Sequence, residues 1–110
     1  MENLDPRLHF VVATAIIERN GKYLIAKRAP HEKAHPNFWT VPGGKLVLHE
    51  YQHLPKTSPT HPQWYNVVDW VLHKEVKEEV GLEIETPKYL CDLVFIRPDG
   101  YPVVTLSYWA

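Results

Sequence analysis

The chain has 110 residues, of which 45% are hydrophobic, and this length fits one compact domain over residues 1–110 with no room for a second. Its formal net charge of −1 excludes a broad basic surface, so we expect no tight binding to nucleic acid or to an anionic membrane, whereas small anionic ligands are compatible with it. The single cysteine, Cys91, allows no intrachain disulfide, and we expect a buried, inert thiol in a cytoplasmic protein.

The first half of the chain has the pattern of strands. Residues 9–18 and 22–28 flank Asn20-Gly21, a two-residue turn signal because both turn positions require positive φ, so we expect an antiparallel hairpin. The first of these segments is apolar at odd and even positions alike, which predicts a sheet covered on both faces. Its apolar run stops at Glu18 and is too short to span a bilayer.

The segment HEYQH at residues 49–53 has the spacing with which many zinc peptidases bind their metal. Two histidines four positions apart reach one zinc only on a helix. Pro42 upstream and Pro55 downstream leave no useful helical length, so we interpret the pair as a chance spacing and keep a zinc peptidase as a distant alternative. The proline-rich stretch at about 51–62 predicts an extended surface loop.

One long helix is predicted over about 63–80, with Gly81 as its left-handed C-terminal stop. At about 100° per residue, its apolar residues form a stripe that is expected to face the sheet. The stripe contains Trp64, Val67, Val68, Val71, Leu72 and Val76. After the helix, a second hairpin is predicted around residues 98–100, joining strands at about 89–96 and 102–109.

Three carboxylates interrupt the inward face of the predicted helix. Glu75, Glu78 and Glu79 project onto the C-terminal half of the apolar stripe, whereas Lys74 and Lys77 point elsewhere. A merely solvated acidic face is the alternative, but it would lie opposite the stripe, and like charges at these spacings repel by roughly a few tenths of a kcal/mol per pair. A divalent cation would offset the repulsion. All-oxygen ligands suit Mg²⁺ or Mn²⁺, which in turn favour a phosphate-bearing substrate.

These residues fall in a pattern that resembles the signature of the Nudix hydrolases: Gly, five residues, Glu, seven residues, then Arg-Glu-aliphatic-x-Glu-Glu-x-Gly-aliphatic. Residues 44–50 (GKLVLHE) match its first part and residues 74–82 (KEVKEEVGL) its second. The preceding FWTVPG at residues 38–43 and the early hairpin also look like the family, so the resemblance covers most of the chain. It implies an α+β fold in which a mixed β-sheet is packed by a long catalytic helix.

The chain departs from the family pattern in three ways. The 23 residues at 51–73 stand where the family has seven, and the excess of 16 fits the proline-rich loop plus an early helical turn, which need not move the helix relative to the sheet. Lys74 replaces the usual Arg, which removes a planar bidentate fork and predicts weaker activity. The family's domain usually continues into a further strand and helix, so we expect this chain to be a fragment or to be partnered, for instance as a homodimer.

The resemblance implies hydrolysis of a nucleoside diphosphate linked to another moiety. Glu78 and Glu79 are then expected to bind Mg²⁺ or Mn²⁺ with help from the Gly43 carbonyl, and Glu75 to ligate metal or to activate the attacking water. The expected catalytic residues are Glu75, Glu78, Glu79, Lys74 and Glu50. The expected substrate-binding residues are Arg28, Lys45 and Gly44, although single basic residues at strand ends are usually just solvated.

Substrate identity is left open by the sequence. Damaged nucleoside triphosphates, nucleotide sugars and dinucleotides all fit, because specificity lies in loops such as 29–37 and 51–62. Four aromatic residues are candidates for stacking on a base, although aromatics in a small domain mostly belong to the core. They are Trp39, Tyr51, Trp64 and Tyr65.

The second hypothesis is a catalytically weak or inactive Nudix-like nucleotide-binding module. Lys74 in place of Arg and the short C-terminus favour this module. The three inward carboxylates favour an active enzyme, because an inactive descendant has no reason to keep them.

Overall fold

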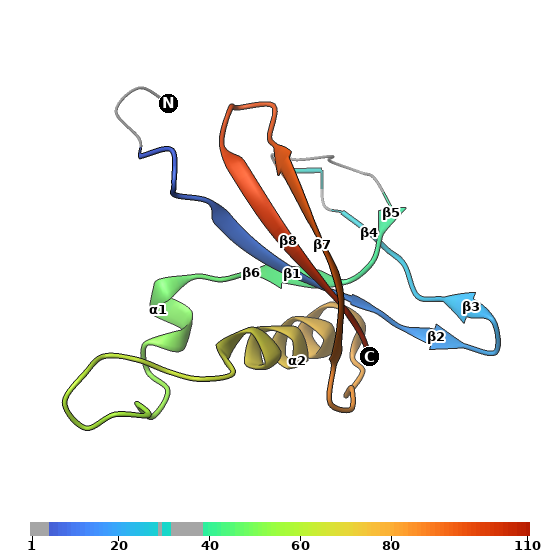
Figure 1. Ribbon diagram of the computed structural model, residues 1–110. Coiled ribbons are helices and arrows are strands. Elements are labelled where there is room, and N and C mark those ends of the chain that lie inside the picture. Colours follow the sequence, from blue (N-terminus) through green and yellow to red (C-terminus); the bar gives the residue numbers. More distant parts are fainter. Residues whose placement is uncertain (1–4, 29, 32–38) are drawn as a thin grey trace.

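A mixed β-sheet with one long helix against it forms the body of the molecule (Figure 1), a computed structural model that describes residues 5–28, 30–31 and 39–110. The four strands of the sheet lie in the order β6-β1-β8-β7. Their bounds are β6 Gly43–Lys45, β1 Phe10–Ile16, β8 Pro102–Trp109 and β7 Lys88–Ile96. β1 runs antiparallel to β6 and parallel to β8, whereas β8 and β7 are antiparallel, so the sheet is mixed and the fold is α+β, as predicted.

The long helix α2 (Val67–Val80) begins four residues later than predicted. Asn66, immediately before it, has a left-handed backbone with φ 63°, and the residues preceding it form contacts of the proline-rich loop instead. There the Trp64 indole N–H donates to the Leu54 carbonyl over 2.8 Å, so Trp64 belongs to the loop and not to the helix stripe. Gly81 ends the helix as predicted, with φ 72° and its N–H donating to the Lys77 carbonyl.

The core lies where α2 packs against β1. Ala13 and Ala15 on β1 are buried against Leu72 and Val76 of the helix, and the small alanines let the helix backbone approach the sheet closely. Burial of each of the two larger side chains stabilises the fold by roughly 1.5–3 kcal/mol. Val71 is also buried, so the central part of the predicted apolar stripe is confirmed.

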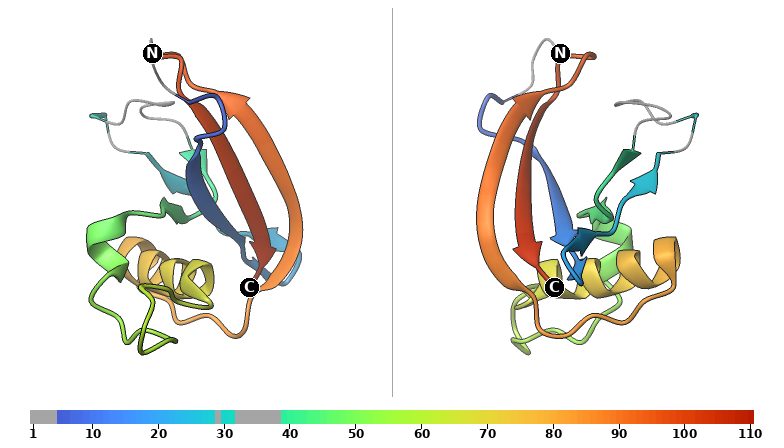
Figure 2. Two further views of the ribbon diagram at one scale, coloured as in Figure 1. Left: turned by 60° about the vertical axis from the view of Figure 1, so that its left-hand side comes forward. Right: turned by 90° about the vertical axis from the view of Figure 1, so that its right-hand side faces the viewer.

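The early hairpin forms around the predicted turn, but it is short. Asn20 and Gly21 have φ of 53° and 75°, and β2 (Glu18–Arg19) pairs with β3 (Lys22–Tyr23) across them. The predicted strand over 22–28 is divided, because its second part forms β4 (Ala26–Lys27). This strand pairs with β5 (Trp39–Thr40), in a separate ribbon that lies opposite the face of the main sheet (Figure 2).

The second hairpin is confirmed, whereas the predicted burial of its cysteine is wrong. β7 and β8 pair as expected, with a β-bulge between Tyr89 and Cys91. β7 is an edge strand whose residues are nearly all exposed, so the Cys91 thiol is exposed too. The expected cover of both sheet faces is only partial, because α2 packs mainly against β1 and β6, whereas the residues of β7 are nearly all exposed.

The HEYQH segment contains one helical turn, which the prolines had led us not to expect. Helix α1 (Leu48–Tyr51) starts after β6, which places Glu50 beside the helix α2, and it ends two residues before His53. Within the described residues, no cluster of three or more His, Cys, Asp or Glu side chains has the arrangement of a metal site. Among these same residues, no helix is long and apolar enough to cross a membrane.

Truncation of Leu72 tests the position of the core. We expect Leu72→Ala to lower the free energy of unfolding by roughly 2–5 kcal/mol, because the side chain is fully buried and its removal leaves a cavity. Leu48→Ala, at an exposed position, is the matched control and should change the unfolding free energy little. Urea denaturation followed by circular dichroism measures both, and equal effects would contradict this account of the core.

Candidate functional site

Two glycines of β6 bring three backbone segments together. A Cβ atom at Gly43 would lie 2.3 Å from the Ala13 carbonyl oxygen, so only glycine permits this approach of β6 to β1. A Cβ atom at Gly44 would lie 2.1 Å from Cγ of Glu75, so the neighbouring glycine makes room for a carboxylate from α2. The absence of a side chain at Gly44 therefore leaves the space that the Glu75 side chain occupies.

Lys74 gathers three carboxylates around one ammonium group. Its Nζ lies 3.2 Å from Glu75 Oε1, 3.3 Å from Glu78 Oε2 and 3.7 Å from Glu50 Oε2. We expected Lys74 to point away from the acids, and this expectation is wrong, because the long flexible side chain folds back between them. The contact with Glu50 also shows that the proline-rich insertion leaves both parts of the signature side by side.

The carboxylates determine the ionisation of Lys74. Desolvation alone would lower the pKa of this half-buried ammonium, but the hydrogen bonds from Lys74 to Glu75 and Glu78, together with the charges of Glu75 and Glu50, outweigh it and raise the pKa above the ordinary 10.5. The ammonium therefore stays charged at neutral pH and reduces the repulsion between the acids around it.

One large cavity connects this cluster with the open face of the sheet. It has a volume of about 1220 Å³ and lies between the main sheet and the β4–β5 ribbon, which diverge from each other above α2 (Figure 2). Its acidic wall contains Glu50, Glu75 and Glu79. Its basic residues are Lys27, Arg28, Lys45 and Arg97, and the glycines of β6 lie beside the acids. A cavity of this size exceeds the space that a typical small-molecule site needs.

The three helix carboxylates are not equivalent. Glu75 and Glu79, four residues apart on α2, both line the cavity, and the Glu75 side chain is 19% exposed. Glu78 is 58% exposed and contacts Lys74 outside the cavity wall. The predicted role of Glu78 as a metal ligand stays a prediction, as do the roles of the other two.

The donor atoms of the cavity wall fit a hard divalent cation. Glu50, Glu75 and Glu79 offer only oxygen atoms, the glycines of β6 add backbone carbonyls, and such ligands suit Mg²⁺ or Mn²⁺. These residues are held on backbone that the Gly44 contact fixes in place. The oxygen donors therefore suit such a cation by type. Among the described residues, no group of three or more His, Cys, Asp or Glu side chains is arranged to hold a metal ion, so the predicted metal site stays a prediction.

Solved structures share this fold. The chain is similar to a MutT NUDIX hydrolase from Burkholderia pseudomallei, with 26% identity, a TM-score of 0.70, and coverage of 94% of this chain and 67% of that one. It is also similar to the MutT protein from Methanosarcina mazei Go1, with 18% identity, a TM-score of 0.69, and coverage of 96% and 65%. The chain belongs to the Nudix superfamily.

The Nudix fold is shared over nearly the whole chain but over only part of its relatives. A NUDIX hydrolase from Nitrosomonas europaea matches at 19% identity and a TM-score of 0.66, over 93% of this chain and 57% of that one. The chain thus spans about two thirds or less of the length of these structures. No protein-family profile matches the sequence. No curated protein matches it either.

Of the candidate stacking residues, Trp39 is the one that lines the cavity, and its side chain is exposed. Tyr51 and Trp64 contact each other edge to face, at 5.3 Å between ring centroids, and hold the proline-rich loop against α1. Tyr65 is exposed outside the cavity. Most of the predicted specificity loop 29–37 lies outside the described residues.

Sequence reasoning missed the polar floor of the cavity and the arginine at its far end. Thr14 on β1 and Ser107 on β8 share a hydrogen bond of 2.8 Å between their hydroxyl groups, and both line the cavity. The available signal was a hydroxyl side chain within each of two largely apolar strands, Thr14 in β1 and Ser107 in β8. Arg97 lines the cavity but was not singled out from the sequence, because it directly precedes the turn residues Pro98-Asp99-Gly100 and a basic residue beside a turn suggests no particular role.

Substitution of the two β6 glycines should separate stability from site geometry. We expect Gly43→Ala to lower the free energy of unfolding by roughly 1–3 kcal/mol, because its Cβ meets backbone atoms of β1 that cannot rotate away. Gly44→Ala should cost less, because its Cβ meets only the Glu75 side chain, which can be displaced. Urea titration compares the two variants, and a larger loss for Gly44→Ala would contradict the assignment.

The raised pKa of Lys74 predicts a loss of stability at high pH. A raised folded-state pKa gives stability that is complete below the unfolded value of about 10.5 and is lost as pH rises through the folded value. We expect Lys74→Met to remove this alkaline component from the free energy of unfolding, whereas Lys77→Met, at an exposed position of the same helix, should keep it. Urea titrations between neutral pH and pH of about 11 test this, and identical profiles for both variants would exclude it.

Proposed function

We propose that the protein hydrolyses a nucleoside diphosphate linked to another moiety, with Mg²⁺ or Mn²⁺ as cofactor. The observation that carries this proposal is that one cavity is lined by three carboxylates of the Nudix signature, Glu50, Glu75 and Glu79, together with several basic side chains. Carboxylates alone would repel a pyrophosphate, and basic residues alone would bind one without any means of activating water. The combination suits a bound cation beside an anionic substrate.

The acidic wall would hold the metal. Glu75 and Glu79 of α2 would bind it together with Glu50 and the Gly43 carbonyl, and Glu78 is the further ligand that the signature predicts. A bound Mg²⁺ would neutralise phosphate charge and lower the pKa of a coordinated water. Lys74 would orient the carboxylates through the three ion pairs described above.

The basic side chains of the cavity would position the substrate. Lys45 on β6 and Lys27 on β4 approach from the two sides of the cavity, so a pyrophosphate between them would meet positive charge on both sides. Arg28, the residue after Lys27, also lines the cavity. A carboxylate of the acidic wall that is not bound to metal would accept the proton of the attacking water.

A second candidate is a nucleotide-binding module with weak or no turnover. The Lys74 ammonium favours it, because this point charge lacks the planar fork of arginine and holds Glu75 and Glu78 in a single-point contact each. The two candidates predict the same ligand and differ in turnover, so one kinetic experiment separates them.

Replacement of single acids by glutamine tests the enzymatic proposal. With Mg²⁺ and a panel of nucleoside triphosphates, nucleotide sugars and dinucleotides, we expect Glu75→Gln, Glu78→Gln and Glu79→Gln each to lower kcat by roughly 10²–10⁴-fold. Glu83→Gln is the matched control, because Glu83 pairs with Lys77 outside the cavity. Phosphate or nucleotide release is measured by chromatography.

The outcomes of this experiment are distinct. Activity that survives in Glu78→Gln would remove Glu78 from the metal assignment and leave Glu75 and Glu79. Activity that survives in all three variants would refute the metal-dependent mechanism. Nucleotide binding without turnover in the native protein would support the binding module instead.

A further inference from the structure

Arg97, the residue that follows β7, is the basic residue of the cavity that the proposed function does not use. Its side chain is only 10% exposed and lines the cavity. The guanidinium lies 4.9 Å from the ring centroid of Phe10 and 5.5 Å from that of Tyr101, so two aromatic faces hold its plane. Phe10 precedes Ala13 by three residues on β1, and Ala13 pairs with Gly44 beside the acidic wall. Because the guanidinium lies over Phe10, it is roughly 10 Å along the strand from the acidic wall.

One edge of the Arg97 guanidinium is occupied and the other is open. Nε donates to Asp99 Oδ1 over 3.0 Å, and one N–H of Nη2 donates to Asp99 Oδ2. Nη1 makes no hydrogen bond with any residue that the structure describes. Because no fully buried side-chain nitrogen in the described part of the chain lacks a partner, Nη1 reaches accessible space. The end-on edge formed by Nη1 and Nη2 therefore stays available to a ligand.

The surroundings of this edge favour a flat ring over another phosphate. The wall of the cavity near Arg97 is apolar and includes Phe10, Phe95 and Val103. Asp99 balances the charge of the arginine. The hydrogen bond from Arg97 lowers the pKa of the Asp99 carboxyl, so the pair stays ionised at neutral pH. A neutral pair between aromatic rings attracts a second anion weakly, whereas its directed N–H groups suit the acceptors of a base.

We propose that the open edge of Arg97 recognises the O6 and N7 acceptors of a guanine-type base, making this residue a determinant of substrate specificity. This inference rests on the proposed function, which places the phosphates of the same nucleotide at the acidic wall. Arginine donates two parallel N–H groups to these two acceptors, whereas adenine presents a donor at position 6 and mismatches one of them. The apolar side chains beside Arg97 would contact the ring faces.

Equilibrium binding of GMP, IMP and AMP, measured by calorimetry without added metal, tests the proposal. GMP should bind more tightly than AMP by roughly 10- to 100-fold, and IMP should bind like GMP because it keeps O6 and N7 and lacks only the 2-amino group. Arg97→Lys should bring the ratio of GMP to AMP affinity to within about threefold, because lysine keeps the charge but loses the planar fork.

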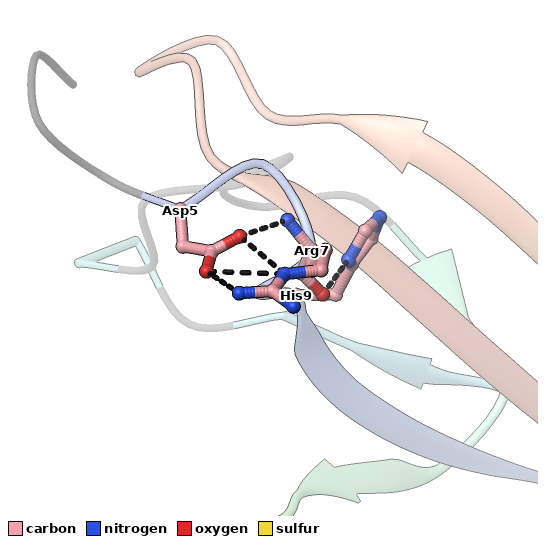
Figure 3. A network of polar contacts seen from close by, with 3 residues as sticks. All are labelled: Asp5, Arg7 and His9. Atoms are coloured by element: carbon pink, nitrogen blue, oxygen red, sulfur yellow. Dashed lines mark hydrogen bonds and ion pairs between the residues drawn. The ribbon is translucent and has the colours of Figure 1, made fainter.

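The chain contains a matched control in a second Arg–Asp pair. Arg7 donates to Asp5 through Nε and Nη2 in the same local geometry, beside His9, but at 87% side-chain exposure and outside the cavity (Figure 3). Arg7→Lys should therefore leave the ratio of GMP to AMP affinity unchanged. Thermal melting of both variants shows whether they fold, and if Arg97→Lys does not, the comparison of GMP, IMP and AMP on the native protein decides alone.

Three results would overturn the inference: equal affinity for GMP and AMP, weak binding of IMP, or an unchanged ratio in a folded Arg97→Lys variant. The native protein is also assayed for hydrolysis of GTP and ATP with Mg²⁺. Turnover of both at equal kcat/KM, with equal binding, would support the proposed function and refute the role of Arg97. Selective binding of GMP and IMP without any turnover would support the role of Arg97 and refute the hydrolase.

Discussion

The close approach of β6 to both β1 and α2 is the constraint on which the site depends. Gly43 lies against the backbone of β1 and Gly44 against Glu75 of α2. The absence of a side chain at these two positions of β6 lets β6, β1 and α2 pack closely together. Acidic residues are thereby held beside the sheet, where their repulsion is partly balanced by Lys74. The close packing of the β6 glycines and the ion pairs of Lys74 therefore act on the same carboxylates, and a change to either alters the geometry of these carboxylates.

Much of this fold could be predicted from the sequence because its signals are local. Asn20-Gly21 set one turn, residues 98–100 set another, and Gly81 ended the helix, since each requires a backbone conformation that few residues adopt. The pairing of β1 with β6 and β8 was not accessible in this way, because it depends on contacts between distant segments. The prediction that Cys91 is buried was wrong for the same reason, because an apolar strand at the edge of a sheet has the same composition as a central one.

The candidate site was predicted in its residue types more than in its geometry. The signature identified the acids and the glycines, but the spacing of Glu75, Glu78 and Glu79 did not reveal that Glu78 lies outside the cavity wall. Side-chain length decided the position of Lys74, which folds back toward the acids although its Cα lies off their face. Arg97 joins the cavity only through the tertiary arrangement of β7 and β1, which no local pattern encodes.

The proline-rich loop has a consequence for how such a domain can diversify. Trp64 closes the loop on itself through Leu54 and Tyr51, and Glu50 and Lys74 still meet across it. The residues of the candidate site are positioned by the sheet and the helix, so the intervening segment acts as a surface appendage whose length carries little entropic cost. Such an appendage can gain or lose residues over evolution and acquire contacts of its own, while the residues of the candidate site keep their positions.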